Sequence, residues 1–406
     1  MYLDARKSLE WPKAEPNRII NQTSDLTEGF KPPAGKGLFP LVPLSPLETA
    51  WVEMNAETIR KAIEASRRTA MAFDRPGFRS GKLAMESDVA RLAELLVRSA
   101  RKHAIEGDLD VALEHYLTAL RMTSHIQKFA SSGWPGQVPN RLRDGLLSWA
   151  AHPDQTAERL KRALDEVKRI PADYSSYERF VKWRWEYDLS DLGGRSPHRQ
   201  NWDEAMRLLA LRWLPWENVR ARRILDYLAR GTIDELRRVE VGLKSNEPVE
   251  SAPVSPDAAR LCNTTCLRGL LDVNTIGWLT ENRIDEEMHR RALVLQLALA
   301  AWRREHGSLP KTLDELVGTY LDAVPVDPYT GKPFAYYPEG RQDAGLGVPM
   351  GMEAYDLGPG GTGGIEVPEV IWEGPMGPFD ASFFAREKAQ WGAPYFRSPA
   401  STFYIP

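Results

Sequence analysis

The stretch from residue 286 to residue 340 constrains the fold more than any other part of this 406-residue chain. Apolar residues recur at steps of four and three, which places them along one face of a helix: Met288, Ala292, Leu295, Leu299 and Trp302. Three further apolar positions widen that face: Leu293, Leu297 and Ala300. The pattern therefore predicts a helix that is buried on more than one side.

The end of this helix and the segments after it are also marked in the sequence. Gly307 stands where a left-handed C-cap is expected, and Pro310 blocks any continuation. Thr312 precedes two acidic residues, which predicts the start of a short second helix. A turn cluster at 325–333 and a strand-like segment at 334–337 follow. None of these features requires a catalyst.

Composition excludes several classes of protein. The 53 basic and 56 acidic residues leave a net charge of −3, so no nucleic-acid partner is expected. No window approaches the roughly 20 apolar residues of a membrane span. The N-terminus lacks the apolar region of a signal peptide, so a possible anchor would lie upstream of Met1. Cys262 and Cys266 are the only cysteines, and we interpret them as buried thiols.

Shifts in composition divide the chain into five parts. Proline-rich and polar stretches mark the boundaries, and the segment 244–256 is the clearest linker. In order, we expect an extended proline-rich arm (1–46), an α-helical domain (47–243), the linker (244–256), helices with a small α+β module (257–365), and an aromatic and proline-rich tail that packs on the body (366–406).

The α-helical domain contains a predicted hairpin at 87–126. Gly107, Ala112, Tyr116 and Ala119 follow the spacing of one tetratricopeptide repeat. No second copy occurs at that period, whereas a stable array needs about three repeats. A single helical hairpin is therefore favoured, and a degenerate repeat array with a peptide-binding groove is the alternative.

A segment rich in aromatic residues, 174–192, follows. Its basic neighbours are Arg179, Lys182 and Arg184, a mixture that can stack bases in a single-stranded nucleic-acid site. Nearby acidic residues cancel this charge. Helix-face packing with cation–π contacts is therefore the favoured interpretation.

The second half of the chain resembles a known family. The motifs Leu-Pro, Thr-Leu-Asp-Glu-Leu, Val-Pro-Val-Asp-Pro and Gly-Lys-Pro-Phe occur in the order found in the globular part of a type II secretion major pseudopilin, over about 290–365. The glycine-rich stretch 355–361 is similar to the loop after the strands in that family. The resemblance implies a helix packed on a small antiparallel sheet, built for assembly. A similar block ends large, mostly helical, uncharacterised envelope proteins of planctomycetes, which the first half also resembles.

Two departures from the pseudopilin pattern affect function. The long apolar helix that anchors a pseudopilin in the membrane and the filament is absent, and about 285 residues of another kind stand before the predicted helix. The family's loop commonly carries an aspartate that helps to hold calcium, and Gly360 stands at that position. Acidic residues lie nearby in sequence, but no spacing singles them out as calcium ligands: Asp343, Glu353 and Asp356. Calcium binding at 358–364 stays open.

The sequence shows no zinc-protease spacing, no nucleophile elbow and no phosphate loop. We therefore predict no catalytic, cofactor-binding or metal-ligating residues and no cofactor. The favoured hypothesis is a mainly α protein with a helical, TPR-like domain and a pseudopilin-like α+β module, acting as a non-enzymatic scaffold for protein partners at the cell envelope. The alternatives are an enzyme with its site between the helical domain and the C-terminal module, and a component of a secretion or pilus-like assembly. The resemblance favours the periplasm or a membrane-associated position, whereas a true start at Met1 would favour the cytoplasm.

Overall fold

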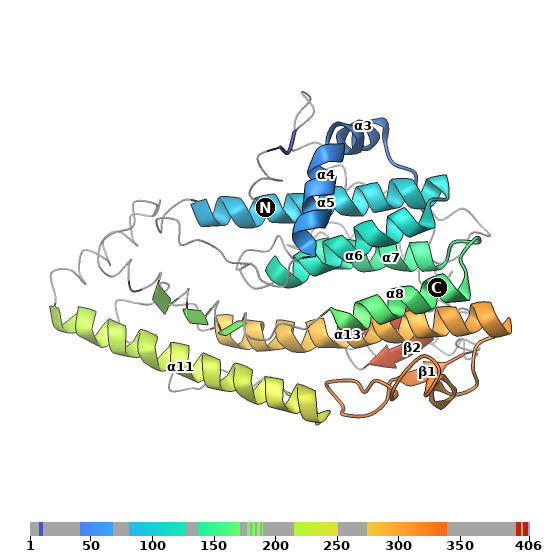
Figure 1. Ribbon diagram of the computed structural model, residues 1–406. Helices are drawn as coiled ribbons and strands as arrows, with labels where there is room; N and C mark the ends of the chain where they lie inside the picture. The colour runs from blue at the N-terminus through green and yellow to red at the C-terminus, as the bar shows by residue number, and fades with distance from the viewer. Residues whose placement is uncertain are drawn as a thin grey trace, which may run out of the picture.

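The computed structural model describes residues 8–10, 41–67, 81–126, 137–170, 215–250, 274–338, 395–398 and 401–404, and seven residues between 177 and 189. The glycine-rich stretch, both cysteines and most of the tail lie outside these ranges. The described chain is mainly helical, as predicted (Figure 1). Its elements are α3 (Pro46–Met54), α4 (Ala56–Ser66), α5 (Gly81–Glu106), α6 (Leu109–Ile126), α7 (Gln137–Ala150), α8 (Ala157–Arg169), α11 (Pro215–Ser245), α13 (Asn274–His306), the 3₁₀ turn η1 (Leu313–Leu316), β1 (Ala335–Tyr337), β2 (Tyr395–Ser398) and β3 (Ser401–Tyr404).

Helices α5, α6 and α7 pack closely because small side chains face one another. Ala100, Ala104 and Ala112 are each fully buried, and the Tyr116 ring is buried among them. The Trp149 indole N–H donates to the Leu109 carbonyl oxygen at 2.9 Å, which ties the end of α7 to the start of α6. The predicted helical hairpin at 87–126 is therefore present as α5 and α6. Its likeness to a tetratricopeptide repeat is not confirmed.

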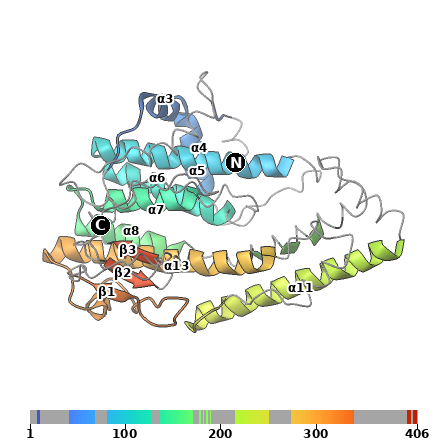
Figure 2. The same ribbon diagram turned by 180° about the vertical axis from the view of Figure 1, so that it is seen from behind.

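Helix α13 contributes many residues to the largest buried cluster of the described structure. Leu295 and Leu297 are each fully buried although they point to nearly opposite sides of the helix. Helices α7, α8 and α11 all pack against α13 (Figures 1 and 2). The prediction of a helix buried on more than one side is confirmed. One buried cluster includes residues of α3 to α8, α13 and η1.

The features that end α13 are partly as predicted. Gly307 has a φ of 76°, and its N–H donates to the Arg303 carbonyl, which confirms the left-handed cap. The predicted second helix is only the 3₁₀ turn η1. It begins with a capping box between Thr312 and Glu315. Extended backbone at Val317 and a left-handed Gly318 (φ 87°) prevent it from continuing as an α-helix.

The sheet differs from the one that the resemblance implies. Strand β1 pairs antiparallel with β2, and β2 pairs antiparallel with β3. Two of the three strands come from 395–404, which the sequence assigned to the tail, and β3 lies against α13. Within 257–365 the described residues contribute only β1, so the pseudopilin-type sheet is not confirmed.

The described part of the predicted linker, 244–250, contacts the body through Val249, whereas its other residues are exposed. Helix α11 continues to Ser245, and Asn246 then adopts a left-handed φ of 58°. Val249 is 2% exposed and packs with residues of α11 and α13, and its N–H donates to the Pro328 carbonyl at 2.9 Å. The division of the chain into domains stays a prediction. None of the described helices is long and apolar enough to cross a membrane.

Candidate functional site

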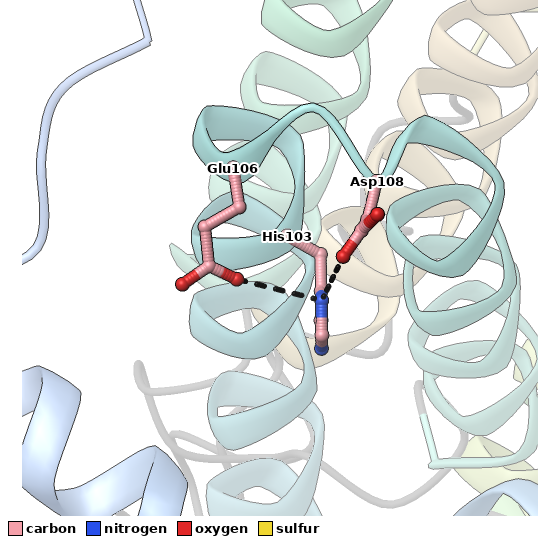
Figure 3. Close-up of side chains that lie close together, drawn as sticks. All are labelled: His103, Glu106 and Asp108. Atoms are coloured by element: carbon pink, nitrogen blue, oxygen red, sulfur yellow. Dashed lines mark ion pairs between the residues drawn. The ribbon is translucent and has the colours of Figure 1, made fainter.

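Three polar side chains meet at the turn between α5 and α6, and we call them the turn cluster: His103, Glu106 and Asp108. His103 Nδ1 lies 3.7 Å from Glu106 Oε2 and 3.7 Å from Asp108 Oδ2 (Figure 3). The candidate ligand atoms of the three residues all lie within 4.8 Å of one another. An imidazole facing two carboxylates is a donor set that metal ions use.

Local backbone geometry brings the turn cluster together. His103 and Glu106 are three residues apart on α5, so they share one helix face. Gly107 adopts a φ of 88° and donates its N–H to the Ala104 carbonyl, while Asp108 N–H donates to the His103 carbonyl. These two bonds form a Schellman motif. It folds the chain back, so that the Asp108 carboxylate returns to the ring of His103.

The surroundings of the cluster set its charge. Lys102 Nζ lies 2.8 Å from Glu106 Oε1 and leaves Oε2 facing His103. The rings of His103 and His115 meet edge to face, with centroids 5.2 Å apart. Burial, and then the charge of His103, lower the pKa of His115 to about 4. His115 is therefore neutral near pH 7. Neither His103 Nδ1 nor His115 Nδ1 makes a hydrogen bond within the described structure.

Sequence reasoning missed the turn cluster. The sequence has no zinc-protease spacing, and none of the three residues was predicted to be a metal ligand. The signal in the sequence was a histidine followed by a glutamate three residues later and an aspartate five residues later, across a glycine. This spacing brings the three side chains together only because the chain turns at Gly107.

Two ionisable side chains of α13, Glu287 and His289, contact arginines. Glu287 is 1% exposed and pairs with three arginines of its own helix: Arg283, Arg290 and Arg291. His289 contacts the Arg143 guanidinium of α7 at 2.5 Å, and burial followed by that charge lowers its pKa to about 4. Mutual pairing of this kind is typical of structural ion networks. It gives the enzyme hypothesis no support at its proposed location.

The described members of the aromatic segment also serve packing. Tyr177 and Val181 are buried against Leu236 of α11 and Leu279 of α13. The Trp185 indole N–H donates to Asp226 Oδ1 at 2.8 Å. These side chains pack against α11 or bond to it, and they do not form a surface on which nucleic-acid bases could stack.

Helix α11 carries the four most exposed large apolar side chains of the described structure. Trp216 is 66% exposed, Val219 51%, Tyr227 52% and Val241 65%. At about 100° per residue these four positions fall within roughly 80° of one another around the helix. We call this stripe, with the exposed charged residues on it, the α11 face: Trp216, Val219, Arg220, Arg223, Tyr227, Arg230, Asp234, Arg237, Arg238 and Val241.

Comparisons with protein-family models, curated proteins and solved structures find no match. The pseudopilin resemblance therefore stays a prediction from the sequence motifs.

Proposed function

We propose that this protein is a non-enzymatic helical scaffold whose α11 face docks an acidic segment of a protein partner. The observation that carries the proposal is the row of four large apolar side chains, each more than half exposed, on one side of a single helix. Single exposed apolar residues are ordinary, whereas an aligned row of them is typical of interaction sites. The envelope location belongs to the proposal too, and the sequence resemblance supports it.

The exposed apolar row of α11 is not needed to pack the helix against the rest of the protein. The residues that α11 buries lie away from the stripe: Ala221, Ile224, Leu225, Thr232, Leu236, Val239 and Leu243. The helix is thus already held by its inner side. Trp, Tyr and Arg are the residues most enriched in the energetic centres of protein interfaces. The α11 face presents all three types.

Charge indicates the chemistry of the partner. Five arginines and one aspartate lie on the α11 face. Four of these arginines pair with acidic side chains beside the face: Arg220 with Glu217 at 3.6 Å, Arg230 with Asp226 at 3.6 Å, Arg237 with Glu178 at 3.0 Å and Arg238 with Glu235 at 2.6 Å. Exposed pairs of this kind contribute little stability. An acidic partner segment can therefore replace the present carboxylate partners of these arginines with little loss of stability.

Site-specific photo-crosslinking tests the proposal in cells of the source organism. A photo-reactive residue at Val219 or Tyr227 is expected to capture one defined protein. The same residue at Val111 of α6, which is 41% exposed, serves as the control and is expected not to capture it. The captured protein is then purified and titrated against the full chain.

Val241→Asp adds a negative charge to the α11 face, and we expect it to weaken that complex by about tenfold or more because charge repulsion opposes an acidic partner. Val111→Asp is the matched control and is expected to bind as the wild type does. Equal binding by both variants would contradict the proposal. Binding of the chain to vesicles containing anionic lipid, reduced by Val241→Asp and without a protein partner, would instead assign the α11 face to a membrane surface.

A further inference from the structure

We propose that the turn cluster is a binding site for a divalent transition-metal ion, with zinc as the best match to its ligands. His103 Nδ1, one oxygen of Glu106 and one oxygen of Asp108 would be the protein ligands. The proposal is independent of the α11 face, because the cluster lies at the α5–α6 turn and shares no residue with that face.

The distances fit an ion better than they fit a hydrogen-bonded triad. His103 Nδ1 is 3.7 Å from each carboxylate oxygen, which is too long for a hydrogen bond. With metal–ligand bonds of about 2.1 Å, the ligand atoms of a tetrahedral site lie roughly 3.4 Å apart. Small rotations of the Glu106 and Asp108 side chains, which are 44% and 64% exposed, would bring all three atoms to that separation.

A second observation points to a ligand at the same place. His103 Nδ1 is a buried nitrogen that makes no hydrogen bond within the described structure. Such atoms are rare in native proteins, and an ion is one of the explanations for them. Behind His103 stands the ring of His115, which is 7% exposed and also has an Nδ1 without a hydrogen-bond partner among the described residues. The two rings in contact hold the His103 nitrogen toward the carboxylates.

The type of ligand selects the metal. Calcium and magnesium prefer oxygen ligands alone, whereas an imidazole with carboxylates suits zinc and its first-row neighbours. Three protein ligands on an exposed turn leave coordination positions for water. Lys102 bonds the second oxygen of Glu106 and so orients that carboxylate, as outer groups commonly do at metal sites. A bound ion would clamp the end of α5 to the start of α6.

Isothermal titration calorimetry of the full chain with zinc chloride tests the site. We expect one ion per chain in the wild type. Asp108→Asn and His103→Gln each remove one ligand, and each is expected to weaken binding by at least about tenfold. The matched control is Asp154→Asn: Asp154 Oδ2 also faces a histidine, His152 Nδ1, at 4.0 Å, but no third ligand is present there among the described residues. This variant is expected to bind as the wild type does.

Cobalt in place of zinc distinguishes this site from the cysteines. Cobalt bound by nitrogen and oxygen gives visible bands without the thiolate charge-transfer absorption that Cys262 or Cys266 would produce. A thermal scan adds a second readout, because an ion that binds only the folded state raises the melting temperature. The zinc-dependent rise is expected in the wild type and absent in Asp108→Asn. Binding that is unchanged in both ligand variants, or that carries the thiolate band, would overturn the proposal.

Discussion

Glu287→Gln is expected to lower the free energy of unfolding by about 3–5 kcal/mol, because it removes the charge of a buried carboxylate that pairs with three arginines. Glu287 is 1% exposed, and its oxygens lie 2.7 Å from Arg290 and 2.9 Å from Arg291. Chemical denaturation followed by circular dichroism measures the change. The variant keeps the size of the side chain, so a loss of this size reports the charge rather than a cavity.

The network around Glu287 joins three parts of the chain, which is why its loss is costly. The Arg291 guanidinium also donates to the Leu243 carbonyl of α11 at 2.6 Å and to the Val326 carbonyl of the turn at 2.9 Å. Glu287 holds that guanidinium in place. Without the carboxylate, Arg291 is a charge in a site that is 9% exposed, and it can recover hydration only by releasing the turn.

The effect of Glu287→Gln depends on pH. Burial alone would raise the pKa of Glu287, but the hydrogen bond and charge of Arg290, the charge of Arg283 and the hydrogen bond of Arg291 lower it overall from the ordinary 4.5. The carboxylate therefore stabilises the fold above the ordinary value, and its contribution is lost as the pH falls through the lowered value. We expect the difference between wild type and variant to be largest near neutral pH and to shrink below pH 4.5.

Glu57→Gln is the matched control for this prediction. Glu57 pairs with Arg60 at the same spacing of three residues and the same 2.7 Å, but both side chains are more than half exposed. Exposed pairs contribute little to stability. A large loss in the control, or none in Glu287→Gln, would contradict the claim that burial of the network decides its importance.

Helices that depend on local patterns were predictable from the sequence. The apolar spacing around Leu295 and the glycine at position 307 identified α13 and its end, because both signals act within one or two turns of helix. The break between α3 and α4 was not predicted. There α3 ends and α4 begins at Asn55, whose side-chain amide donates to the Trp51 and Glu10 carbonyls. A contact to a segment 45 residues away cannot be inferred from periodicity.

The partners of β1 in the sheet and the turn cluster were not predicted, for related reasons. Strand β1 pairs with residues near position 396, about sixty positions further along the chain, and no local signal specifies such a partner. The turn cluster is local, but its residues become neighbours only through the backbone bonds around Gly107. The spacing of residues in the sequence indicates which side chains share a helix face. It does not indicate which side chain after a turn, such as Asp108, will lie against the preceding helix.

Gly145→Ala is expected to destabilise the protein by roughly 1–2 kcal/mol, although alanine favours helices more than glycine does. Gly145 lies within α7, and a Cβ there would stand 2.8 Å from Cε1 and 2.9 Å from the hydroxyl oxygen of Tyr116. Tyr116 is fully buried, so its ring has no room to move away. The cost of overpacking, about 1–3 kcal/mol, exceeds the gain of up to about 1 kcal/mol in helix propensity.

Gly231→Ala tests the same substitution where no atom opposes it. Gly231 lies within α11, is exposed, and a Cβ there would meet nothing within 4 Å. We expect this variant to gain about 0.5–1 kcal/mol, since alanine loses less backbone entropy than glycine in a helix. Adding Tyr116→Phe to Gly145→Ala removes the hydroxyl contact and is expected to recover part of the loss, which a double-mutant cycle in chemical denaturation measures. Equal changes in stability at Gly145 and Gly231 would show that helix propensity alone determines the effect of the substitution. The close approach of α7 to Tyr116 would then cost no stability.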